Sequence, residues 1–434
     1  MSAEDKVDLI VAGGGLAGLT AGYVAAKEGL SVLVIERGNY SGSKNVMGGV
    51  LYSYPLKDLI PSFWEEAPVE REIEEENFWF LTEDAAFKVG HKNKVFSQKH
   101  NNFTVFRAKF DRWFASKFEE VAEKSGGMLI PETRVDEVLV EDGRVVGVTC
   151  GGEKLYSNCV IIADGVTSLL TEKLQLRPPL TPNSVALAIK EVLSLPSSKI
   201  EDRFCLEKNT GATIELYGYI TRGMLGTGFI YTNKDTLSIG IGCLLSDFLK
   251  TRVKPYELLD SFKSHPVIKP LLEGTKEEEY LAHLIPEAGY NALPKLYGEG
   301  VMVVGDAALL VNSIHREGSN LAIASGKMAS EVVVEAHKKG DFSSNSLSVY
   351  EERLRQSFVI KDLQKYANLF PFLEKNPQFL TTYIEVINKF FEEMLTVDGV
   401  PKQDKQKAVL GYFLKKRNYL QIFNDIIGLL WRIK

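Results

Sequence analysis

The chain has 434 residues, of which 25% are charged, and a formal net charge of −6. Its mean hydropathy is −0.07. This length suits two or three structural units with large buried cores, and the negative net charge excludes a general attraction for nucleic acid. The first residues lack the apolar segment of a secretory signal, and no run of roughly 18 apolar residues occurs. We therefore expect neither a signal peptide nor a transmembrane helix.

Four cysteines lie far apart, at positions 150, 159, 205 and 243. None forms a C-x-x-C pair, and their spacing matches no metal-binding pattern, so we expect no metal site. Cysteines of this kind are typically small buried side chains in a reducing compartment. The cytoplasm is the expected location.

The first forty residues are the most informative stretch. An apolar run, Val7–Ala12, is followed by the spacing G-x-G-x-x-G at Gly13, Gly15 and Gly18, and then by a small-residue helix. A second apolar strand ends at Glu36. Glycines in this strand–turn–helix–strand context predict a dinucleotide-binding unit.

Each part of the unit has a physical role. Gly13 permits the tight turn, Gly15 lets the backbone approach a pyrophosphate, and Gly18 lets helix and strand pack closely. The helix N-terminus offers free N–H groups and a favourable dipole to the anion. Glu36 can accept hydrogen bonds from the adenosine ribose, and its charge disfavours a 2′-phosphate, so we do not expect NADP.

Three later features have open interpretations. Residues 41–52 are rich in glycine, and Lys44 and Asn45 could donate hydrogen bonds to a flat ligand; a plain flexible loop is the alternative. Residues 65–76 contain seven glutamates, which is typical of a solvated face and less often of a docking patch. Arg107, between a strand and an aromatic-rich helix, is either a phosphate contact or an ordinary surface arginine.

The remaining chain alternates between sheet and helix patterns. Asp142-Gly143 between alternating runs predicts a hairpin, and two buried strands end at Ala163-Asp164-Gly165 and at Gly305-Asp306. Residues 184–245 have the alternation of an antiparallel sheet, and the chain after residue 343 is helical.

The glycine turn, Asp164 and Asp306 are far apart in sequence, so one cofactor can contact all three only in an interleaved fold. In this arrangement the chain resembles the glutathione-reductase-type FAD fold, in its hydroxylase-like branch. The resemblance implies FAD, with Glu36 at the adenosine ribose and Asp306 at a ribitol hydroxyl. It also implies that Arg107 and Val135 lie near the pyrophosphate and the adenine.

The start of the helix at residues 318–320 matches the segment beside the isoalloxazine in that family. The residues expected to contact FAD are Gly13, Gly15, Leu16, Ala17, Gly18, Glu36, Arg37, Lys44, Asn45, Gly48, Gly49, Arg107, Val135, Ala163, Asp164, Gly165, Gly305, Asp306, Gly318, Ser319 and Asn320. The chain has neither a redox C-x-x-x-x-C nor a second G-x-G-x-x-G, so we do not expect direct NADH oxidation.

Six segments carry a closer resemblance over nearly the whole chain. They are Gly42–Val46, Arg107–Trp113, Gly228–Asp235, Gly305–Ala308, His315–Gly318 and Leu395–Lys402. Together they resemble the FixC-type branch of the electron-transfer-flavoprotein:quinone oxidoreductases. That family passes electrons from a soluble electron-transfer flavoprotein to a membrane quinone.

The resemblance implies several partners. They are the α and β subunits of an electron-transfer flavoprotein, a separate small ferredoxin-like iron–sulfur subunit and a quinone, with menaquinone expected. A complex that includes the flavoprotein pair is a candidate for electron bifurcation, with the splitting flavin in the partner. Near the presumed flavin, His315 could relay a proton, or merely cap or pack, and Arg316 could stabilise a reduced anionic flavin or form a structural ion pair.

Quinone is lipid-soluble, and residues 401–434 are suited to a membrane surface. They contain eight Lys or Arg and two Asp, together with aromatic and apolar residues. This composition predicts an interfacial anchor facing anionic lipid, and the alternative is a terminal helix pair packed on the protein. The expected location is cytoplasmic, peripheral on the inner face of the cell membrane.

Three rival functions remain open. A prenyl-lipid (geranylgeranyl) reductase shares this FAD fold, but its Tyr-x-Trp-x-Phe-Pro strand is not matched by Thr227–Thr232. An aromatic monooxygenase would need NAD(P)H directly. An electron-relay subunit would bind FAD and have no quinone chemistry of its own.

The sequence predicts an α/β protein, α+β overall. We expect a discontinuous, interleaved FAD-binding Rossmann-like domain with a β-meander at residues 1–180 and 290–342. An antiparallel-sheet substrate or quinone domain is expected at residues 181–289, and a helical C-terminal region with a possible membrane-surface tail at 343–434.

Overall fold

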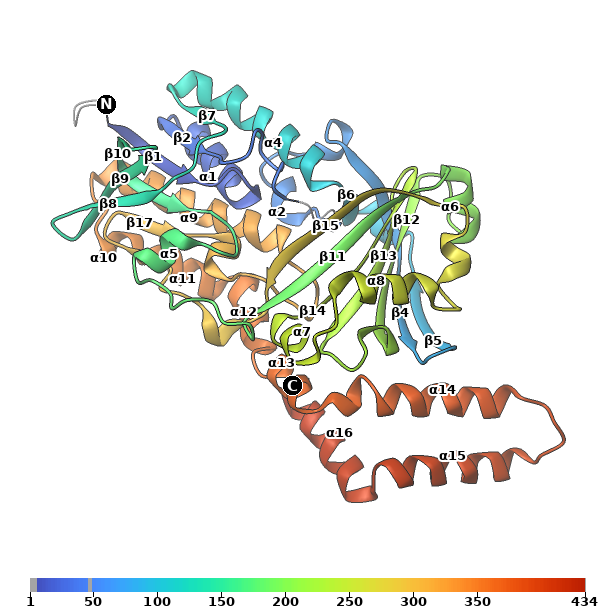
Figure 1. The fold of residues 1–434 in the computed structure, drawn as a ribbon. Coiled ribbons are helices and arrows are strands. Elements are labelled where there is room, and N and C mark those ends of the chain that lie inside the picture. Colours follow the sequence, from blue (N-terminus) through green and yellow to red (C-terminus); the bar gives the residue numbers. More distant parts are fainter. Residues whose placement is uncertain (1–5, 46–48, 434) are drawn as a thin grey trace. The chain divides into compact units, whose positions relative to one another are not determined.

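The computed structural model describes residues 6–45 and 49–433 and divides into two compact units (Figure 1). Unit 1 comprises the residues up to 70, 100–185 and 283–364. Unit 2 comprises residues 71–99, 186–282 and 365 onward. The chain thus passes repeatedly between the units, and the predicted α/β class with an interleaved Rossmann-like unit is confirmed.

Unit 1 is built around β1 (Val7–Ala12), which lies inside a sheet of order β16-β17-β10-β1-β2-β7. The neighbours β10 (Glu153–Ile162) and β2 (Val32–Ile35) both run parallel to β1. Residues 9–11 are completely buried, as expected for a parallel strand covered on both faces. The other strands are β7 (Met128–Ile130), β16 (Tyr297–Gly298) and β17 (Val301–Val303).

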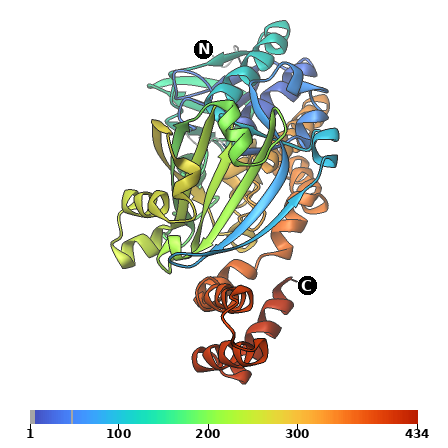
Figure 2. The ribbon, with the colours of Figure 1, turned by 90° about the vertical axis from the view of Figure 1, so that its right-hand side faces the viewer.

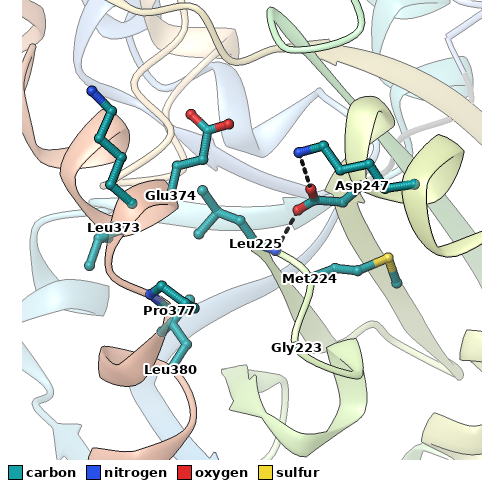
Figure 3. Close-up of a pocket in the computed structure, with 10 residues that line it drawn as sticks. Gly223, Met224, Leu225, Asp247, Leu373, Glu374, Pro377 and Leu380 are labelled. Atoms are coloured by element: carbon teal, nitrogen blue, oxygen red, sulfur yellow. Dashed lines mark hydrogen bonds and ion pairs between the residues drawn. The ribbon is translucent and has the colours of Figure 1, made fainter.

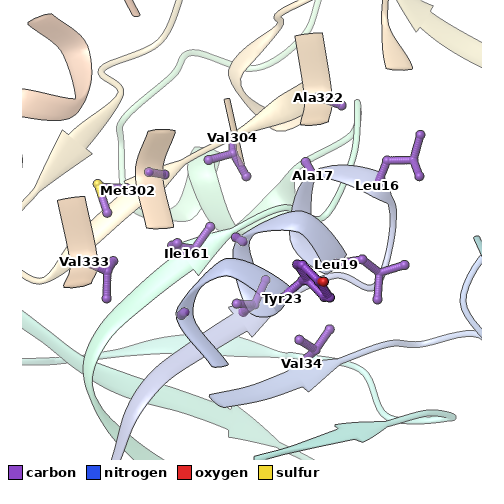
Figure 4. Packing of buried hydrophobic residues seen from close by; sticks show 14 of the residues in the cluster. Leu16, Ala17, Leu19, Tyr23, Val34, Ile161, Met302, Val304, Ala322 and Val333 are labelled. Atoms are coloured by element: carbon purple, nitrogen blue, oxygen red, sulfur yellow. The ribbon is translucent and has the colours of Figure 1, made fainter. Parts of the chain in front are cut away.

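The core of unit 1 forms where α1 (Leu16–Lys27) packs against α9 (Ser319–Lys339) and α4 (Arg107–Ala122). Figure 4 shows Leu19 and Tyr23 of α1 in the same apolar cluster as strand residues of the sheet. A Cβ at Gly326 would lie 2.3 Å from the carbonyl oxygen of Ala17, so only glycine allows α1 and α9 to approach this closely.

A small antiparallel extension interrupts the parallel sheet. β8 (Glu137–Glu141) and β9 (Arg144–Cys150) form the predicted hairpin, and β9 also pairs with β10. Asp142 and Gly143, at the turn, have φ values of 50° and 79°, the left-handed pair that such two-residue turns require. An antiparallel pair also joins β3 (Gly49–Tyr52) to β6 (Asn102–Val105).

Short helices complete unit 1. They are α2 (Tyr54–Lys57), α5 (Leu169–Lys173), α10 (Ser344–Leu347), α11 (Val349–Gln356) and α12 (Phe358–Lys365), with the 3₁₀ turns Phe63–Glu65, Glu123–Ser125, Tyr290–Ala292 and Gly305–Ala308.

Unit 2 contains a sheet of order β15-β11-β14-β13-β12-β4, with β5 on β4. The strands are β4 (Val69–Leu81), β5 (Ala86–Lys92), β11 (Val185–Ser194), β12 (Thr210–Gly218), β13 (Gly226–Thr232), β14 (Thr236–Leu244) and β15 (Lys276–Pro286). The predicted antiparallel pairing holds from β11 to β12, whereas β4 joins β12 in parallel. Helices α7 (Leu245–Thr251) and α8 (Pro255–Ser264) contact β14.

The interpretation of the glutamate run as a solvated face holds only in part, because Glu65 and Glu66 are exposed whereas most of the run forms β4. Glu74 is only 4% exposed, and Arg71 is 1% exposed. The Arg71 guanidinium is satisfied internally: Nη1 lies 3.0 Å from a Glu201 oxygen, and Nε donates to the Asn233 carbonyl at 2.6 Å. As a consequence residues 71–99 belong to unit 2, where β4 pairs with β12, and not to the FAD-binding region in which we expected them.

The C-terminal residues also differ from the predicted boundaries, since residues 343–364 group with unit 1 and the rest with unit 2. The terminal helices are α13 (Leu369–Lys375), α14 (Thr382–Leu395), α15 (Lys402–Lys416) and α16 (Tyr419–Ile433). Helices α14 and α15 form a hairpin, visible in red in Figures 1 and 2. The remaining helices of unit 2 are α3 (Val95–Gln98), α6 (Ser197–Arg203) and the 3₁₀ turns Tyr219–Thr221, Lys269–Leu272 and Pro377–Phe379. Within residues 6–45 and 49–433, no helix combines the length and apolarity needed to cross a bilayer.

Candidate functional site

The glycine turn places β1, α1 and β10 in close contact. Gly13 has φ +116°, and a Cβ there would lie 2.2 Å from the Ala163 carbonyl oxygen. A Cβ at Gly18 would lie 1.9 Å from the Gly13 carbonyl oxygen, whereas no atom of the described residues lies within 4 Å of the Cβ position of Gly15. Gly13 and Gly18 are therefore required for packing, and Gly15 leaves the backbone open to a ligand.

The N-terminus of α1 is suited to an anion. Gly15 is its N-cap residue and supplies no side-chain cap, and Leu16 and Ala17 are buried behind it. The first amides of a helix are unsatisfied within the helix, and the dipole there favours negative charge. This arrangement suits the pyrophosphate of a dinucleotide.

Glu36 is held at the end of β2 by two backbone amides. Its carboxylate accepts from Gly14 N at 2.9 Å and from Gly38 N at 2.6 Å. The Thr133 amide donates to the Glu36 carbonyl at 2.9 Å, which brings the segment carrying the half-buried Val135 beside the acid. The structure thus brings together the residues predicted for the adenosine end of the cofactor.

Arg107 connects three of the predicted segments. It forms a two-point ion pair with the buried Asp111, at 2.7 and 2.8 Å. Nη1 donates to Ser319 Oγ at 3.3 Å, and with the Asn45 amide oxygen turned toward it the guanidinium donates there at 2.8 and 3.2 Å. A fixed guanidinium is suited to phosphate or to an anionic ring. Burial raises the pKa of Asp306, and the positive charge of Arg107 opposes that rise.

Several buried polar atoms around these segments lack hydrogen-bond partners among the described residues. They include Ser41 Oγ, Ser43 Oγ, Asp164 Oδ1 and Asn320 Oδ1. Burial also raises the pKa of Asp164, which favours the protonated, donating carboxyl. Buried polar groups without partners are rare in folded proteins, because each costs free energy. FAD offers phosphate oxygens, hydroxyls and ring nitrogens that match such donors and acceptors, so the residues present fit FAD.

The remaining residues predicted to contact FAD differ in exposure and in their place in the fold. Arg37 and Lys44 are exposed, Gly49 begins β3, and Gly48 lies outside the described residues. Gly305 has φ +59°, and its Cβ position is 2.8 Å from the Ala17 side chain, which brings the Gly-Asp turn against the start of α1. Gly165 (φ +82°) follows Asp164 in a turn, and Gly318 is the N-cap residue of α9.

His315 and Arg316, the predicted catalytic residues, lie in a short loop, residues 312–317. The loop is closed by reciprocal backbone hydrogen bonds between Asn312 and Glu317, at 2.8 and 3.0 Å. Arg316 has φ +58°, a left-handed conformation that is uncommon outside glycine, and His315 is exposed. Their catalytic roles stay predictions.

Sequence reasoning missed three residues near this site. Asp111 follows Arg107 by four residues on a predicted helix, and this spacing could have identified the pair. His283, on β15, carries a pKa lowered by burial and by Arg107 and Arg37, and burial raises the pKa of Glu287 to about 7. No local sequence pattern marks these last two, because only the tertiary structure buries them.

A pocket of about 310 Å³ occurs separately, within unit 2 (Figure 3). It is lined by Met224, Leu225 and the start of α7 on one side and by residues of α13 on the other. Of its two acids, Asp247 and Glu374, Asp247 accepts from Leu225 N at 2.9 Å and from Lys250 at 3.2 Å. Among the residues that the structure describes, no predicted cofactor residue lines it.

The fold and the site define a FAD-dependent oxidoreductase. The profile of the family described as FAD dependent oxidoreductase matches residues 8–165. The fold is similar to that of a geranylgeranyl bacteriochlorophyll reductase-like protein from Thermoplasma acidophilum, with TM-score 0.72 and 21% identity over 98% of this chain and 99% of that one. It is also similar to the flavin-dependent brominase Bmp2, with TM-score 0.66 and 17% identity over 94% and 100%. At these identities the likeness concerns the fold alone.

Related sequences identify the family more narrowly than the fold does. Protein FixC of Azorhizobium caulinodans is 45% identical over 97% of this chain and 98% of its own. A protein of Escherichia coli strain K12 described as probable electron transfer flavoprotein-quinone oxidoreductase YdiS is 40% identical over 97% and 98%. The profile of the ETF-QO/FixC family C-terminal domain matches residues 369–433. The chain belongs to the ETF-QO/FixC family of electron-transfer oxidoreductases.

Proposed function

We propose that the chain passes electrons from an electron-transfer flavoprotein, through a separate ferredoxin-like iron–sulfur subunit, to a membrane quinone, with menaquinone as the expected acceptor. The observation that carries this proposal is the similarity over nearly the full length to FixC and to the YdiS oxidoreductase. FAD, when bound, supplies the conversion between one-electron and two-electron transfer. The chain's own residues bind and orient it.

The proposed binding roles follow the geometry of unit 1. The start of α1 and Gly15 hold the pyrophosphate, and Glu36 holds the adenosine ribose. Arg107, oriented by Asp111 at 2.7 Å, positions the segments of Asn45 and Ser319 around the flavin end. Asp306, beside Arg107, holds a ribitol hydroxyl.

The separate iron–sulfur subunit is proposed because this chain offers its four thiols at scattered sites. Cys159 is buried in β10 of unit 1 and Cys243 in β14 of unit 2, and burial raises the pKa of both. Cys205 is exposed and Cys150 half-buried. Cluster ligands need adjacent thiolates, which favours a cluster on another chain. Electron bifurcation within a complex that includes the flavoprotein pair is a further part of the proposal.

The proposed membrane contact is α16, a helix that buries its acidic residue and exposes its apolar side chains. Its acid, Asp425, is 5% exposed, and its carboxylate accepts from Arg417, Tyr383 and Gln378 at 2.5–3.0 Å. The apolar side chains face outward instead, with Trp431 79% exposed and Leu420 69% exposed. The exposed apolar residues of α16 are Tyr419, Leu420, Phe423, Ile426, Ile427, Leu430, Trp431 and Ile433. An outward apolar helix face of this size is typical of an interfacial segment.

Charge contributes less to this surface than the sequence count implies. Lys405 is buried against Asp398 at 2.8 Å, Arg417 pairs with Asp425, and Lys416 pairs with Glu385. Lys407 also pairs with Asp404 at 3.6 Å, so four of the eight basic residues at 401–434 are paired with acids within unit 2. We propose a peripheral location on the cytoplasmic face of the cell membrane, held mainly by the apolar face of α16.

The central test is anaerobic. The FAD-loaded protein is photoreduced, a soluble menaquinone analogue is added, and flavin absorbance is followed. We expect rapid, saturable reoxidation with one quinol formed per FAD. Failure of quinone to reoxidise the flavin, with normal reoxidation by oxygen or a ferredoxin, would favour the relay subunit or the prenyl-lipid reductase. Bleaching of the oxidised flavin by NADH or NADPH would favour the monooxygenase.

The membrane proposal has its own test. Sedimentation with vesicles containing phosphatidylglycerol should detect binding that the triple variant Leu420→Ser/Phe423→Ser/Trp431→Ser loses by roughly tenfold or more, since each buried apolar side chain is worth about 1.5–3 kcal/mol. Leu249→Ser, at an exposed apolar position on α7, is the matched control. Equal binding by the triple variant would contradict the role of α16.

A further inference from the structure

The end of β15 carries two ionisable side chains toward the flavin region of unit 1. Residues 283, 285 and 287 share one side of an extended chain, because side chains alternate along a strand. His283 feels the charges of Arg107 and Arg37, and the Glu287 carboxyl hydrogen-bonds with Ser313. The segment 283–287 thus reaches from the Arg107 cluster to the loop at residues 312–317.

The Glu287 carboxyl has a buried oxygen with unused hydrogen-bonding capacity. Its backbone amide donates to the Ser184 carbonyl at 2.9 Å, which fixes the chain at this point. Its Oε2 atom is buried and has no hydrogen-bond partner in the part of the chain that the structure describes. Burial raises the pKa of Glu287 to about 7, and the hydrogen bond with Ser313 opposes part of that rise.

A second buried polar side chain lies on the same loop. Asn312 is 2% exposed, its Oδ1 accepts from the His315 amide at 3.3 Å, and its side chain also hydrogen-bonds with the Glu317 carboxyl. Among the described residues, the Glu287 Oε2 acceptor is therefore the atom left unsatisfied beside Ser313. Such an atom costs about 1–3 kcal/mol unless a ligand or water satisfies it, which points to a polar ligand here.

We infer that Glu287, acting through Ser313, supplies a proton to a quinone-class acceptor whose oxygen is bound at the 312–317 loop. The inference rests on the proposed function. A quinone takes two electrons and two protons to become a quinol. Reduced anionic FAD, when bound, would supply both electrons and one proton. The second proton leaves Glu287, whose O–H bond breaks while a quinol O–H bond forms by way of Ser313, and water reprotonates the carboxylate.

Other charged groups surround the loop and must be separated from Glu287. His315, Arg316 and Glu317 lie on the loop, Asp362 on α12, and His283 and Arg107 on the adjoining segments. Burial and Asp362 raise the pKa of Glu317, whereas the pKa of His283 is lowered from 6.5. Titration of His283 would therefore affect the reoxidation rate below pH 6.5. The variant Glu317→Gln separates the contribution of Glu317 from that of Glu287.

The test measures flavin reoxidation by the menaquinone analogue between pH 5 and 9. In the wild-type protein the rate should fall as pH rises through about 7, because only protonated Glu287 donates. Glu287→Gln should lower the rate roughly 100-fold at pH 6 and abolish the fall in rate near pH 7. Ser313→Ala should lower it at every pH, and Glu287→Asp should restore part of it. Glu278→Gln, which changes an exposed acid on β15, should keep the wild-type profile, and Glu317→Gln should keep the fall in rate near pH 7.

A spectroscopic readout separates this inference from the proposed function. Infrared titration of the protein should show a carboxylic acid C=O band that disappears near pH 7 and is absent in Glu287→Gln. If the wild-type flavin is reoxidised by quinone while Glu287→Gln keeps the rate and its fall near pH 7, the proton role is wrong and the proposed function stands. If quinone does not reoxidise the wild-type flavin, both are wrong, whatever the infrared band shows.

Discussion

The flavin region of unit 1 and the helix α16 of unit 2 have opposite polarity. In unit 1, polar atoms such as Asp164 Oδ1 and Asn320 Oδ1 are buried without hydrogen-bond partners among residues 6–45 and 49–433. In α16 the buried polar group, Asp425, is fully paired, and the apolar side chains are exposed. Unused hydrogen-bonding capacity in the interior points to a small polar ligand, whereas unused apolar area on the surface points to a broad partner.

The largest expected effect comes from the glycine turn. Gly18→Val places side-chain atoms where even a Cβ would be 1.9 Å from the Gly13 carbonyl oxygen. Because backbone atoms cannot move aside, we expect a loss of about 3 kcal/mol or more in unfolding free energy and no measurable FAD binding. Thermal unfolding and flavin fluorescence measure both.

Gly411→Ala is the matched control for that variant. Gly411 lies inside α15 with nothing within 4 Å of its Cβ position. Removing a helix glycine there should raise stability by about 0.5–1 kcal/mol and leave FAD binding unchanged. Normal FAD binding by Gly18→Val would refute the close-packed turn.

Asp425→Ala should have the next largest effect. The substitution leaves Arg417, Tyr383 and Gln378 without their shared acceptor, and we expect a loss of about 2–3 kcal/mol. The loss should be local to α16, so hydrogen exchange of its amides should rise while those of β1 stay protected. Unchanged protection of α16 would show that its apolar side chains hold it in place.

Glu287 predicts a pH dependence of stability within the flavin region. Its pKa is raised from 4.5 to about 7, so the folded protein retains a proton that the unfolded chain releases. Stability should therefore fall as pH rises from 4.5 to about 7, by at most roughly 3 kcal/mol. Glu287→Gln should remove this dependence, which denaturant titrations of the wild type and the variant at pH 5 and pH 8 would measure.

The smallest stability effect is expected on the outward face of α16. Leu420→Ser and Phe423→Ser replace side chains that are 69% and 60% exposed. Each should change the unfolding free energy by no more than about 0.5 kcal/mol, because the removed groups are already in water. Urea unfolding measures this, and a larger loss would mean that the face is covered in solution.

The sequence by itself determined the Rossmann-like unit, because its signals are local. The apolar strand before Gly13, the glycine spacing and Glu36 lie within forty residues, and their helix and strand periods leave little choice of structure. Arg107 was also identifiable, since the junction of a strand and a helix is a local feature. The family resemblance added FAD and the distant Asp306.

Only the tertiary structure decided the rest, because burial depends on contacts between residues far apart in the sequence. The glutamate run became β4 once Arg71 could pair with Glu201, 130 residues away. Glu287 became a neutral-pH acid through burial beside Ser313, and α16 turned its apolar face outward because Asp425 had three partners inside. Composition could not predict these outcomes, since the same side chains exposed to water would carry ordinary charges and no unmet hydrogen bonds.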